Sequence, residues 1–256
     1  MKIATWNVNS IRQREGHVHR WLTQCQPDVL FLQEIKCETH AFPALAFHGL
    51  GYTAEAVGQK SYNGVAVLSR VPFTVVHRAL PGLPADDAQA RYLEIQTADM
   101  TLIGIYLPNG NSGGPAGFSY KLKWMECLAE RARDLLASDR PLAITGDFNV
   151  CPTDDDYAPG ALSATDALVR PESRSRFRQL IWLGLTDAIR ATHPHGHIYT
   201  FWDYQAGAWQ RDLGLRIDHT LLSPALAERL ISALPDKAER DQPQPSDHVP
   251  MVTELG

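Results

Sequence analysis

The sequence predicts a mixed α/β fold, because strand-like and helix-like segments alternate along it and two of the strands form a hairpin. The run Val29–Leu32 is continuous, apolar and of strand length, as in a strand buried on both faces. The segment 119–137 has apolar residues at helical spacing. A short turn joins the strand-like runs 92–96 and 101–106. No segment has the composition of a linker, so we expect a single domain over residues 1–256.

The same patterns give bounds for the other elements. We expect strands at 2–8, 29–32, 64–69, 92–96, 101–106, 141–145, 200–202, 216–222 and 246–253. Helices are expected at 14–25, 119–137 and 176–191. Loops are expected at 108–117, 152–175 and 236–245, where Gly, Pro, Asn, Asp and Ser accumulate. A loop as long as 152–175 in a compact domain is more often functional than not.

Composition places the chain among ordinary globular proteins, with 44% hydrophobic and 21% charged residues. There is no apolar run long enough for a transmembrane helix and no signal-peptide pattern, so we expect no membrane association. The four cysteines show neither C-x-x-C nor zinc-finger spacing, which favours reduced thiols and the cytoplasm. The net charge of −5 does not exclude a nucleic-acid enzyme, because DNA contact needs only a local basic face.

Polar clusters follow the apolar runs at five places in the sequence. They are Trp6-Asn7-Val8-Asn9, Gln33-Glu34, Gly146-Asp147-Phe148-Asn149, Arg216-Ile217-Asp218-His219 and Ser246-Asp247-His248. Each cluster alone is more often a turn or a solvated charge than a ligand. Together, at strand ends, they can converge on one cleft. Oxygen-rich ligands of this kind suit Mg²⁺ better than zinc, and a cation that keeps open positions predicts phosphoryl chemistry.

Taken in order, these clusters resemble the exonuclease III-type AP endonucleases of the endonuclease/exonuclease/phosphatase superfamily. The matching segments are Ile3–Arg12, Leu32–Lys36, Tyr62–Ala66, Tyr106–Gly110, Gly146–Val150, Leu215–Asp218 and Ser246–Pro250. They span nearly the whole chain. The Gly-Asp-Phe-Asn and Ser-Asp-His motifs alone would indicate only the superfamily.

The resemblance implies a four-layer α/β sandwich, with two packed mixed β-sheets flanked by helices. It also implies Mg²⁺ or Mn²⁺ as cofactor and in-line attack of water on DNA phosphodiester bonds. The implied activities are 3′→5′ exonuclease and incision at abasic sites, as in base excision repair. We therefore expect a monomer that acts on double-stranded DNA with abasic sites or 3′ ends.

The motifs and the resemblance together assign candidate roles. The catalytic candidates are Tyr106, Asp147, Asn149, Asp218 and His248. The candidate metal ligands are Asn7, Glu34, Asp147, Asn149, Asp247 and His248. In the main hypothesis Asp147 orients or deprotonates the attacking water, Asn149 donates to a phosphoryl oxygen, and His248, oriented by Asp218, contacts the phosphate. An alternative makes His248 the general base.

DNA contacts are predicted at two sets of residues. Candidate phosphate contacts are Arg12, Lys36, Arg91, Lys121, Arg174 and Arg176. For any of them, a solvated surface charge is an equal alternative. The resemblance implies an abasic-sugar pocket lined by Phe201, Trp202 and Leu215, although Trp202 suits the core at least as well.

Two departures from the family pattern concern substrate preference. The loop 110–117 contains no basic residue where some relatives insert an arginine into DNA, and Asn9 replaces an aspartate found in some relatives. Apart from these departures, two other functions stay open. One is a phosphodiesterase or phosphatase of the same superfamily that acts on RNA, lipid or inositol phosphates. The other is a non-catalytic DNA-binding module.

Overall fold

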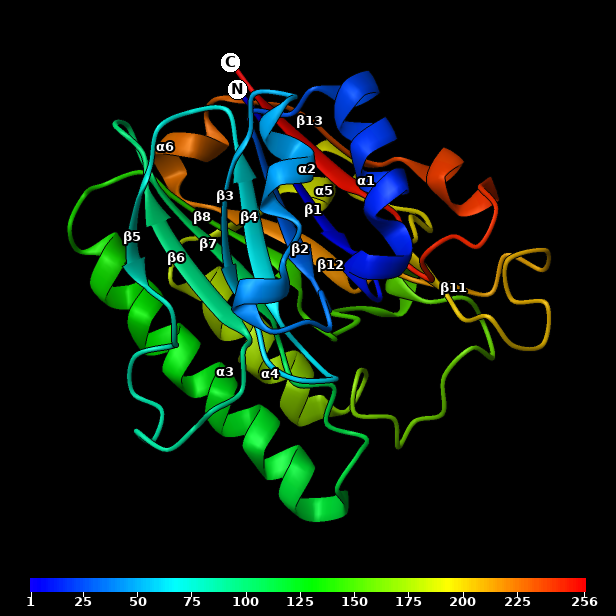
Figure 1. Cartoon of the computed structure of the whole chain (residues 1–256). Coiled ribbons are helices and arrows are strands. Elements are labelled where there is room, and N and C mark those ends of the chain that lie inside the picture. Colours follow the sequence, from blue (N-terminus) through cyan, green and yellow to red (C-terminus); the bar gives the residue numbers. More distant parts are fainter.

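Two six-stranded β-sheets pack face to face between two layers of helices in the computed structural model, which describes residues 1–256 (Figure 1). The first sheet has the order β13 (Leu230–Pro235), β14 (Met251–Leu255), β1 (Lys2–Asn7), β2 (Val29–Gln33), β4 (Val65–Ser69), β3 (Thr53–Val57). The second has the order β5 (Thr74–His77), β6 (Tyr92–Gln96), β7 (Thr101–Tyr106), β8 (Leu142–Asp147), β12 (Asp218–Leu222), β9 (Thr186–Asp187). Both sheets are mixed, which confirms the expected four-layer sandwich.

Alternation along the strands builds three apolar layers. In β2, Val29 and Phe31 face the second sheet, whereas Leu30 and Leu32 pack under α1 (Ile11–Cys25) and α2 (Ala44–His48). On the other side, the outer face of the second sheet packs against α3 (Gly114–Leu136) and α4 (Pro171–Trp182). Figure 1 shows these two helix pairs on opposite outer faces. The sheets are thus buried on both faces, which explains their near-continuous apolar runs.

One close approach fixes how the two sheets pack. A Cβ added to Gly104 in β7 would lie 2.0 Å from the ring of Phe31 in β2. Gly104 therefore gives the Phe31 ring room against the backbone of the facing sheet. A larger residue here would have to push the two sheets apart.

The topology places polar strand ends at one edge of the sandwich. β1 pairs parallel with β2, which sets Asn7 opposite Gln33, and β7 pairs parallel with β8, which sets Tyr106 opposite Asp147. β12 runs antiparallel to β8 and sets Asp218 opposite Asp147. Side chains predicted to act together therefore meet through strand register. The first and last strands are also neighbours, and both termini lie at the opposite end from this edge (Figure 1).

Several expected elements differ in the structure. The helix expected at 176–191 is two helices, α4 and α5 (Ala188–Thr192), separated by the short strand β9. The expected loop 152–175 contains a 3₁₀ turn at Asp154–Asp156 and the start of α4, and α3 begins at Gly114, inside the loop expected at 108–117. The strand expected at 216–222 begins only at Asp218, because Arg216 and Ile217 form the link between β11 (Gly214–Leu215) and β12.

Other short elements have weak sequence signals. The edge strands β3, β5 and β13, the helices α2 and α6 (Pro224–Ala227), and the 3₁₀ turns at Thr39–Ala41 and Lys237–Asp241 were not expected. The last expected strand begins only at Met251.

Two predictions from composition can be compared with the structure. The four cysteines are all free thiols, as expected. None of the helices has the length and hydropathy needed to cross a bilayer.

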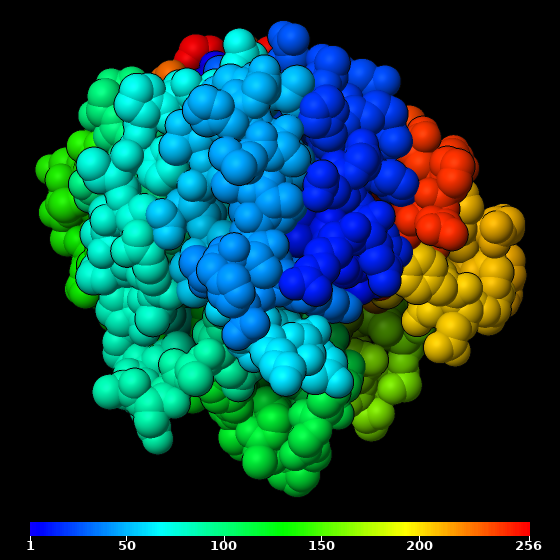
Figure 2. Space-filling model, viewed as in Figure 1, coloured from blue at the N-terminus to red at the C-terminus, as the bar shows by residue number.

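The surface in Figure 2 is formed mainly by the N-terminal third of the chain, and a lobe from residues near 205 protrudes at its edge.

Candidate active site

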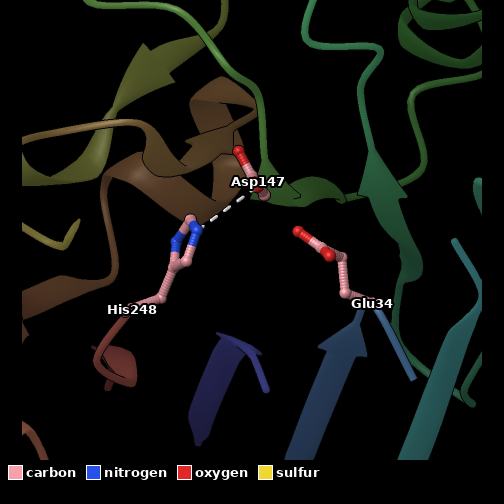
Figure 3. A group of neighbouring side chains, drawn as sticks. All are labelled: Glu34, Asp147 and His248. Atoms are coloured by element: carbon pink, nitrogen blue, oxygen red, sulfur yellow. Dashed lines mark ion pairs between the residues drawn. The ribbon is translucent and has the colours of Figure 1, made fainter. Parts of the chain in front are cut away.

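Three side chains from distant parts of the sequence converge at the polar edge of the sandwich. Glu34 follows β2, Asp147 ends β8 and His248 precedes β14. One ligand atom from each lies within 4.8 Å of the others, and Figure 3 shows the three side chains pointing into a common space. Asp147 and His248 are buried, whereas Glu34 is partly exposed. The cluster is therefore open to solvent on the side of Glu34.

Asn7 joins the two carboxylates of this cluster. Its Nδ2 donates to Glu34 Oε1 at 2.9 Å and to Asp147 Oδ2 at 3.0 Å, and its Oδ1 accepts from the backbone of Asn9. The side chain of Asn7 is fully buried. A single side-chain amide thereby bridges the two carboxylates.

The backbone at the site adopts conformations that few residues favour. Glu34 has φ 49° and Asn149 has φ 48°, both in the left-handed region. Such strain accumulates at functional sites. Gly146 has φ 148°, and a Cβ there would lie 2.0 Å from the carbonyl oxygen of Ile105. Only glycine lets β8 approach β7 here and present Asp147 beside Tyr106.

His248 lies between two carboxylates. Its Nδ1 is 2.8 Å from Asp218 Oδ2 and its Nε2 is 3.7 Å from Asp147 Oδ2. The ring of Phe201, in β10 (Phe201–Trp202), packs edge-on against the imidazole, with centroids 4.9 Å apart. Burial lowers the pKa of His248, but Asp218 and Asp147 outweigh this and raise it to about 10. The imidazole is therefore protonated at neutral pH.

Asp147 is buried and has an unusual pKa. Burial raises the pKa of this carboxyl to about 7, and the charges of Asp218 and Glu34 act in the same direction. His248 and the hydrogen bond from Asn7 oppose that rise. A carboxyl whose pKa lies near neutrality can accept and release a proton at physiological pH.

Tyr106 stands beside these carboxylates at the end of β7. Burial, followed by the charges of Glu34 and Asp147, raises its pKa well above 10, so its hydroxyl remains a hydrogen-bond donor. Arg91 lies over the Tyr106 ring, 4.7 Å from its centroid, and donates to the Tyr106 carbonyl oxygen at 3.2 Å.

Asn149 is oriented by its neighbours. Its backbone N–H donates to Asp147 Oδ1, its Nδ2 donates to the carbonyl oxygen of Leu107, and its Oδ1 accepts from Asn109 Nδ2, each at 2.9 Å. One amide N–H of Asn149 remains available. Asn109 was not predicted to contribute to the site, although it lies in the Tyr106–Gly110 motif.

Asp247 lies in a neighbouring polar network and is not one of the three clustered side chains. Its Oδ1 accepts from Asn9 Nδ2 at 3.2 Å and from the Ser246 hydroxyl at 3.3 Å. Asn9 also accepts from Lys36, which forms an ion pair with Glu34 at 2.9 Å. Asn9 thus connects Asp247 to the cluster.

The predicted DNA contacts fall into different environments, and one of them is wrong. Lys121 has no exposed surface, and its ammonium donates to backbone carbonyl oxygens inside the protein, so it cannot contact a phosphate on the surface. Arg174 forms an ion pair with Asp154 at 2.9 Å and Arg176 with Glu126. Arg12 is exposed.

The predicted pocket residues also divide. Phe201 and Leu215 face each other across the β10–β11 pair, and Phe201 contacts His248. Trp202 is wholly buried, its Nε1 donates to Asp212 and its ring packs against Tyr199 and Trp209. Trp202 is therefore a core residue, and its assignment to a pocket wall is wrong.

Comparison with known proteins identifies the family. The family model described as "Endonuclease/Exonuclease/phosphatase family" matches residues 4–248. The chain belongs to this family. Its members are divalent-metal-dependent hydrolases, which fits the acidic cluster at the strand ends.

Three relatives illustrate the similarity. Exodeoxyribonuclease III of Haemophilus influenzae is 33% identical over 267 residues, with both chains fully covered. The structure of the 3′ phosphatase NExo from Neisseria, bound to a product DNA hairpin, has 40% identity and a TM-score of 0.94, covering 100% of this chain and 99% of that one. An AP endonuclease from Archaeoglobus fulgidus has 36% identity and a TM-score of 0.93, with the same coverage.

Proposed function

We propose that this protein is a DNA repair nuclease that hydrolyses phosphodiester bonds with a divalent metal, as an abasic-site endonuclease, a 3′→5′ exonuclease or both. The observation that carries the proposal is the convergence of Glu34, Asp147 and His248, with Asn7 joining the two carboxylates. The similarity to an exodeoxyribonuclease, a DNA-bound 3′ phosphatase and an AP endonuclease supports DNA as the substrate.

The donor set fits a hard divalent cation, and we propose Mg²⁺ or Mn²⁺. Glu34 is the leading ligand because its carboxylate is partly exposed. Asn7 is hydrogen-bonded to Glu34 and also to Asp147, so all three side chains lie close to the proposed ion. One N–H of Asn149 Nδ2 remains free, so we assign this residue as a hydrogen-bond donor. When bound, the ion would polarise the phosphate and stabilise its developing charge.

Asp147 is the proposed water-activating group. It is buried at the centre of the cluster, and its pKa of about 7 lets it take a proton from an attacking water. Asp147 also lies within reach of the imidazole of His248, which stabilises its charged form.

His248 is the proposed phosphate contact, and its protonation argues against the alternative role of general base. With its Nδ1 held by Asp218, the protonated ring can present Nε2–H to a non-bridging phosphate oxygen. Asp218 therefore fixes both the direction and the charge of the imidazole.

Asn149 and Tyr106 are the proposed neutral donors. The free N–H of Asn149 can meet a phosphoryl oxygen as charge builds on it. The Tyr106 hydroxyl, which stays protonated, can donate to the phosphate or to the leaving oxygen. Asp247 acts indirectly: it accepts a hydrogen bond from Asn9, and Asn9 in turn accepts one from Lys36.

DNA would lie across this edge of the sandwich. Exposed Arg12 and the partly exposed Lys36 and Arg91 are the proposed phosphate contacts around the cluster. Phe201, which touches His248, and Leu215 would form the apolar wall that accepts a sugar lacking its base. We further propose that the chain works as one domain, as a monomer, in the reducing environment of the cytoplasm; its four free thiols support the last point.

A two-substrate assay tests the function. The protein is incubated with Mg²⁺ and either a duplex with a central abasic-site analogue or a duplex with a recessed 3′ end. A single internal cut identifies endonuclease action, and a ladder of shortened products identifies exonuclease action. Cleavage of neither, with hydrolysis of RNA, lipid or inositol phosphates instead, would reject DNA as the substrate.

A further inference from the structure

Lys121 belongs to a helix on the outside of the second sheet, yet its ammonium group is buried beside the active-site loops. The side chain has no exposed surface. Its Nζ donates to the carbonyl oxygens of Asn109 at 2.9 Å, Asn149 at 2.6 Å and Ala167 at 3.3 Å. An ammonium group has three N–H donors, and here each has an acceptor.

These three carbonyl groups come from three separate loops. Asn109 follows β7, Asn149 follows β8, and Ala167 precedes α4. A single amino group therefore ties together the loops that surround the candidate site. No carboxylate is within hydrogen-bond distance of it. Burial lowers the pKa of Lys121 to about 7, although the charges of Asp147 and Asp166 oppose this. Burying this group costs free energy, which favours a role in geometry over one in stability.

The contacts of Lys121 affect the orientation of the Asn149 side chain. Asn109 and Asn149, whose carbonyl oxygens Lys121 holds, also share a hydrogen bond between their side-chain amides. Asn149 Nδ2 gives one hydrogen to Leu107, so a single N–H remains for a substrate. The direction of that N–H depends on where the two backbone segments lie relative to each other. Lys121 is the only side chain that donates hydrogen bonds to the carbonyl oxygens of both.

We propose that Lys121 is a positioning residue: by holding the Asn109 and Asn149 carbonyl groups, it aims the remaining N–H of Asn149 at the phosphoryl oxygen. This inference rests on the proposed function. A positioning role differs from a general structural role in one respect: replacing Lys121 should lower turnover only when the Asn149 amide is present.

A double-mutant cycle on Lys121 and Asn149 tests whether Lys121 acts by orienting Asn149. Cleavage of the abasic-site duplex is the readout. Lys121→Met keeps the length of the side chain and removes its donors. We expect kcat to fall by roughly 10- to 100-fold with KM changed by less than about 2-fold, since a donor aimed at the transition state is displaced. Asn149→Ala alone should lower kcat by on the order of 10²-fold or more. In that background, Lys121→Met should cost less than about 2-fold further.

The matched control lies in the same helix. Arg131 forms a partly buried ion pair with Glu94 of β6 at 2.6 Å and has no hydrogen bond to the loops that Lys121 holds. Arg131→Met should lower the melting temperature and leave kcat unchanged below the unfolding transition. If Lys121→Met does not fold, Lys121→Gln, which retains an N–H donor, takes its place in the cycle.

The outcomes separate the two proposals. Equal fold-losses from the Lys121 change in the wild-type and Asn149→Ala backgrounds would overturn the positioning role, as would a loss in KM alone. An inactive wild-type protein on every DNA substrate would instead reject the proposed function.

Discussion

At the residue scale, the site consists of ordinary side chains whose surroundings change their chemistry. Burial raises the pKa of Asp147 to about 7, while two carboxylates raise that of His248 to about 10 in spite of burial. Both groups thus bind a proton more tightly than they would in water, and the imidazole keeps the higher pKa. Strongly shifted pKa values of this kind cluster at functional sites.

The role of Asp218 can be tested by Asp218→Asn. The amide keeps the shape of the side chain but removes the charge that holds His248 protonated and oriented. We expect kcat to fall by roughly 10- to 100-fold, the range seen when a carboxylate that orients a functional histidine is lost. Steady-state kinetics at neutral pH measure it. Wild-type turnover in Asp218→Asn would show that His248 needs no such partner.

His219 gives a prediction for stability against pH. It is fully buried, and burial, followed by the charge of Arg216, lowers its pKa to about 4. As pH falls below 6.5 the unfolded chain binds a proton that the folded chain does not, so stability decreases. The loss is complete below about pH 4, where both states are protonated, and amounts to on the order of 3 kcal/mol.

Urea unfolding at pH 7 and pH 4.5 measures this loss. The comparison variant is His219→Gln, which can still donate to the Val150 carbonyl oxygen and accept from Arg216 but does not titrate. The decrease between the two pH values should be smaller in the variant. Equal decreases would mean that other groups cause the acid destabilisation.

Most of this chemistry can be predicted from the sequence, and the buried position of Lys121 is the main exception. Glu34 and Asp147 follow apolar runs and His248 precedes one, so their convergence at strand ends could be anticipated. Lys121 was misassigned to the surface, although it lies four residues before Met125 and seven before Leu128, on the buried stripe of α3. A lysine on an apolar stripe was the available signal that its charge is used inside the protein.

At the element scale, the active-site strand depends on a close backbone approach. Gly146→Ala would place a methyl group within 2.0 Å of the Ile105 carbonyl oxygen, in a backbone conformation that favours glycine. We expect a loss of stability on the order of 3 kcal/mol and a loss of activity, because Asp147 moves with the strand.

The control for this change is Gly16→Ala. Gly16 lies in α1 with nothing within 4 Å of an added Cβ, so alanine should stabilise the protein by about 1 kcal/mol. Thermal unfolding of both variants provides the comparison. A Gly146→Ala protein as stable as the wild type would show that β7 and β8 tolerate separation.

The elements that could not be predicted from the sequence are edge strands and the break between α4 and α5. The edge strands β3, β5 and β13 are only partly buried, so they lack the continuous apolar runs of the central strands. The break between α4 and α5 begins at Gly184, which follows the end of α4 with φ 106°, and Asp187 then pairs with Arg216 at 2.8 Å. Such a tertiary ion pair leaves no periodic pattern in the sequence.

At the scale of the whole molecule, fold and site are stabilised by different groups. The three apolar layers contain none of the cluster residues, and hydrogen bonds from Asn7 already hold the carboxylates together. We therefore expect chelation with EDTA to abolish DNA cleavage while shifting the melting temperature by only a few degrees. Activity assays and calorimetry on the same sample measure both effects. Unfolding on chelation would show that the metal is structural.

The most direct test of the central claim is the rate at which an Asp147→Asn variant cleaves an abasic-site duplex with Mg²⁺ present, measured beside its affinity for that DNA. Asparagine keeps the shape of the side chain and cannot take a proton. We predict a fall in kcat on the order of 10²-fold or more with binding largely unchanged, and intact folding. A near-wild-type rate would contradict the assignment of Asp147 as the water-activating group at this site.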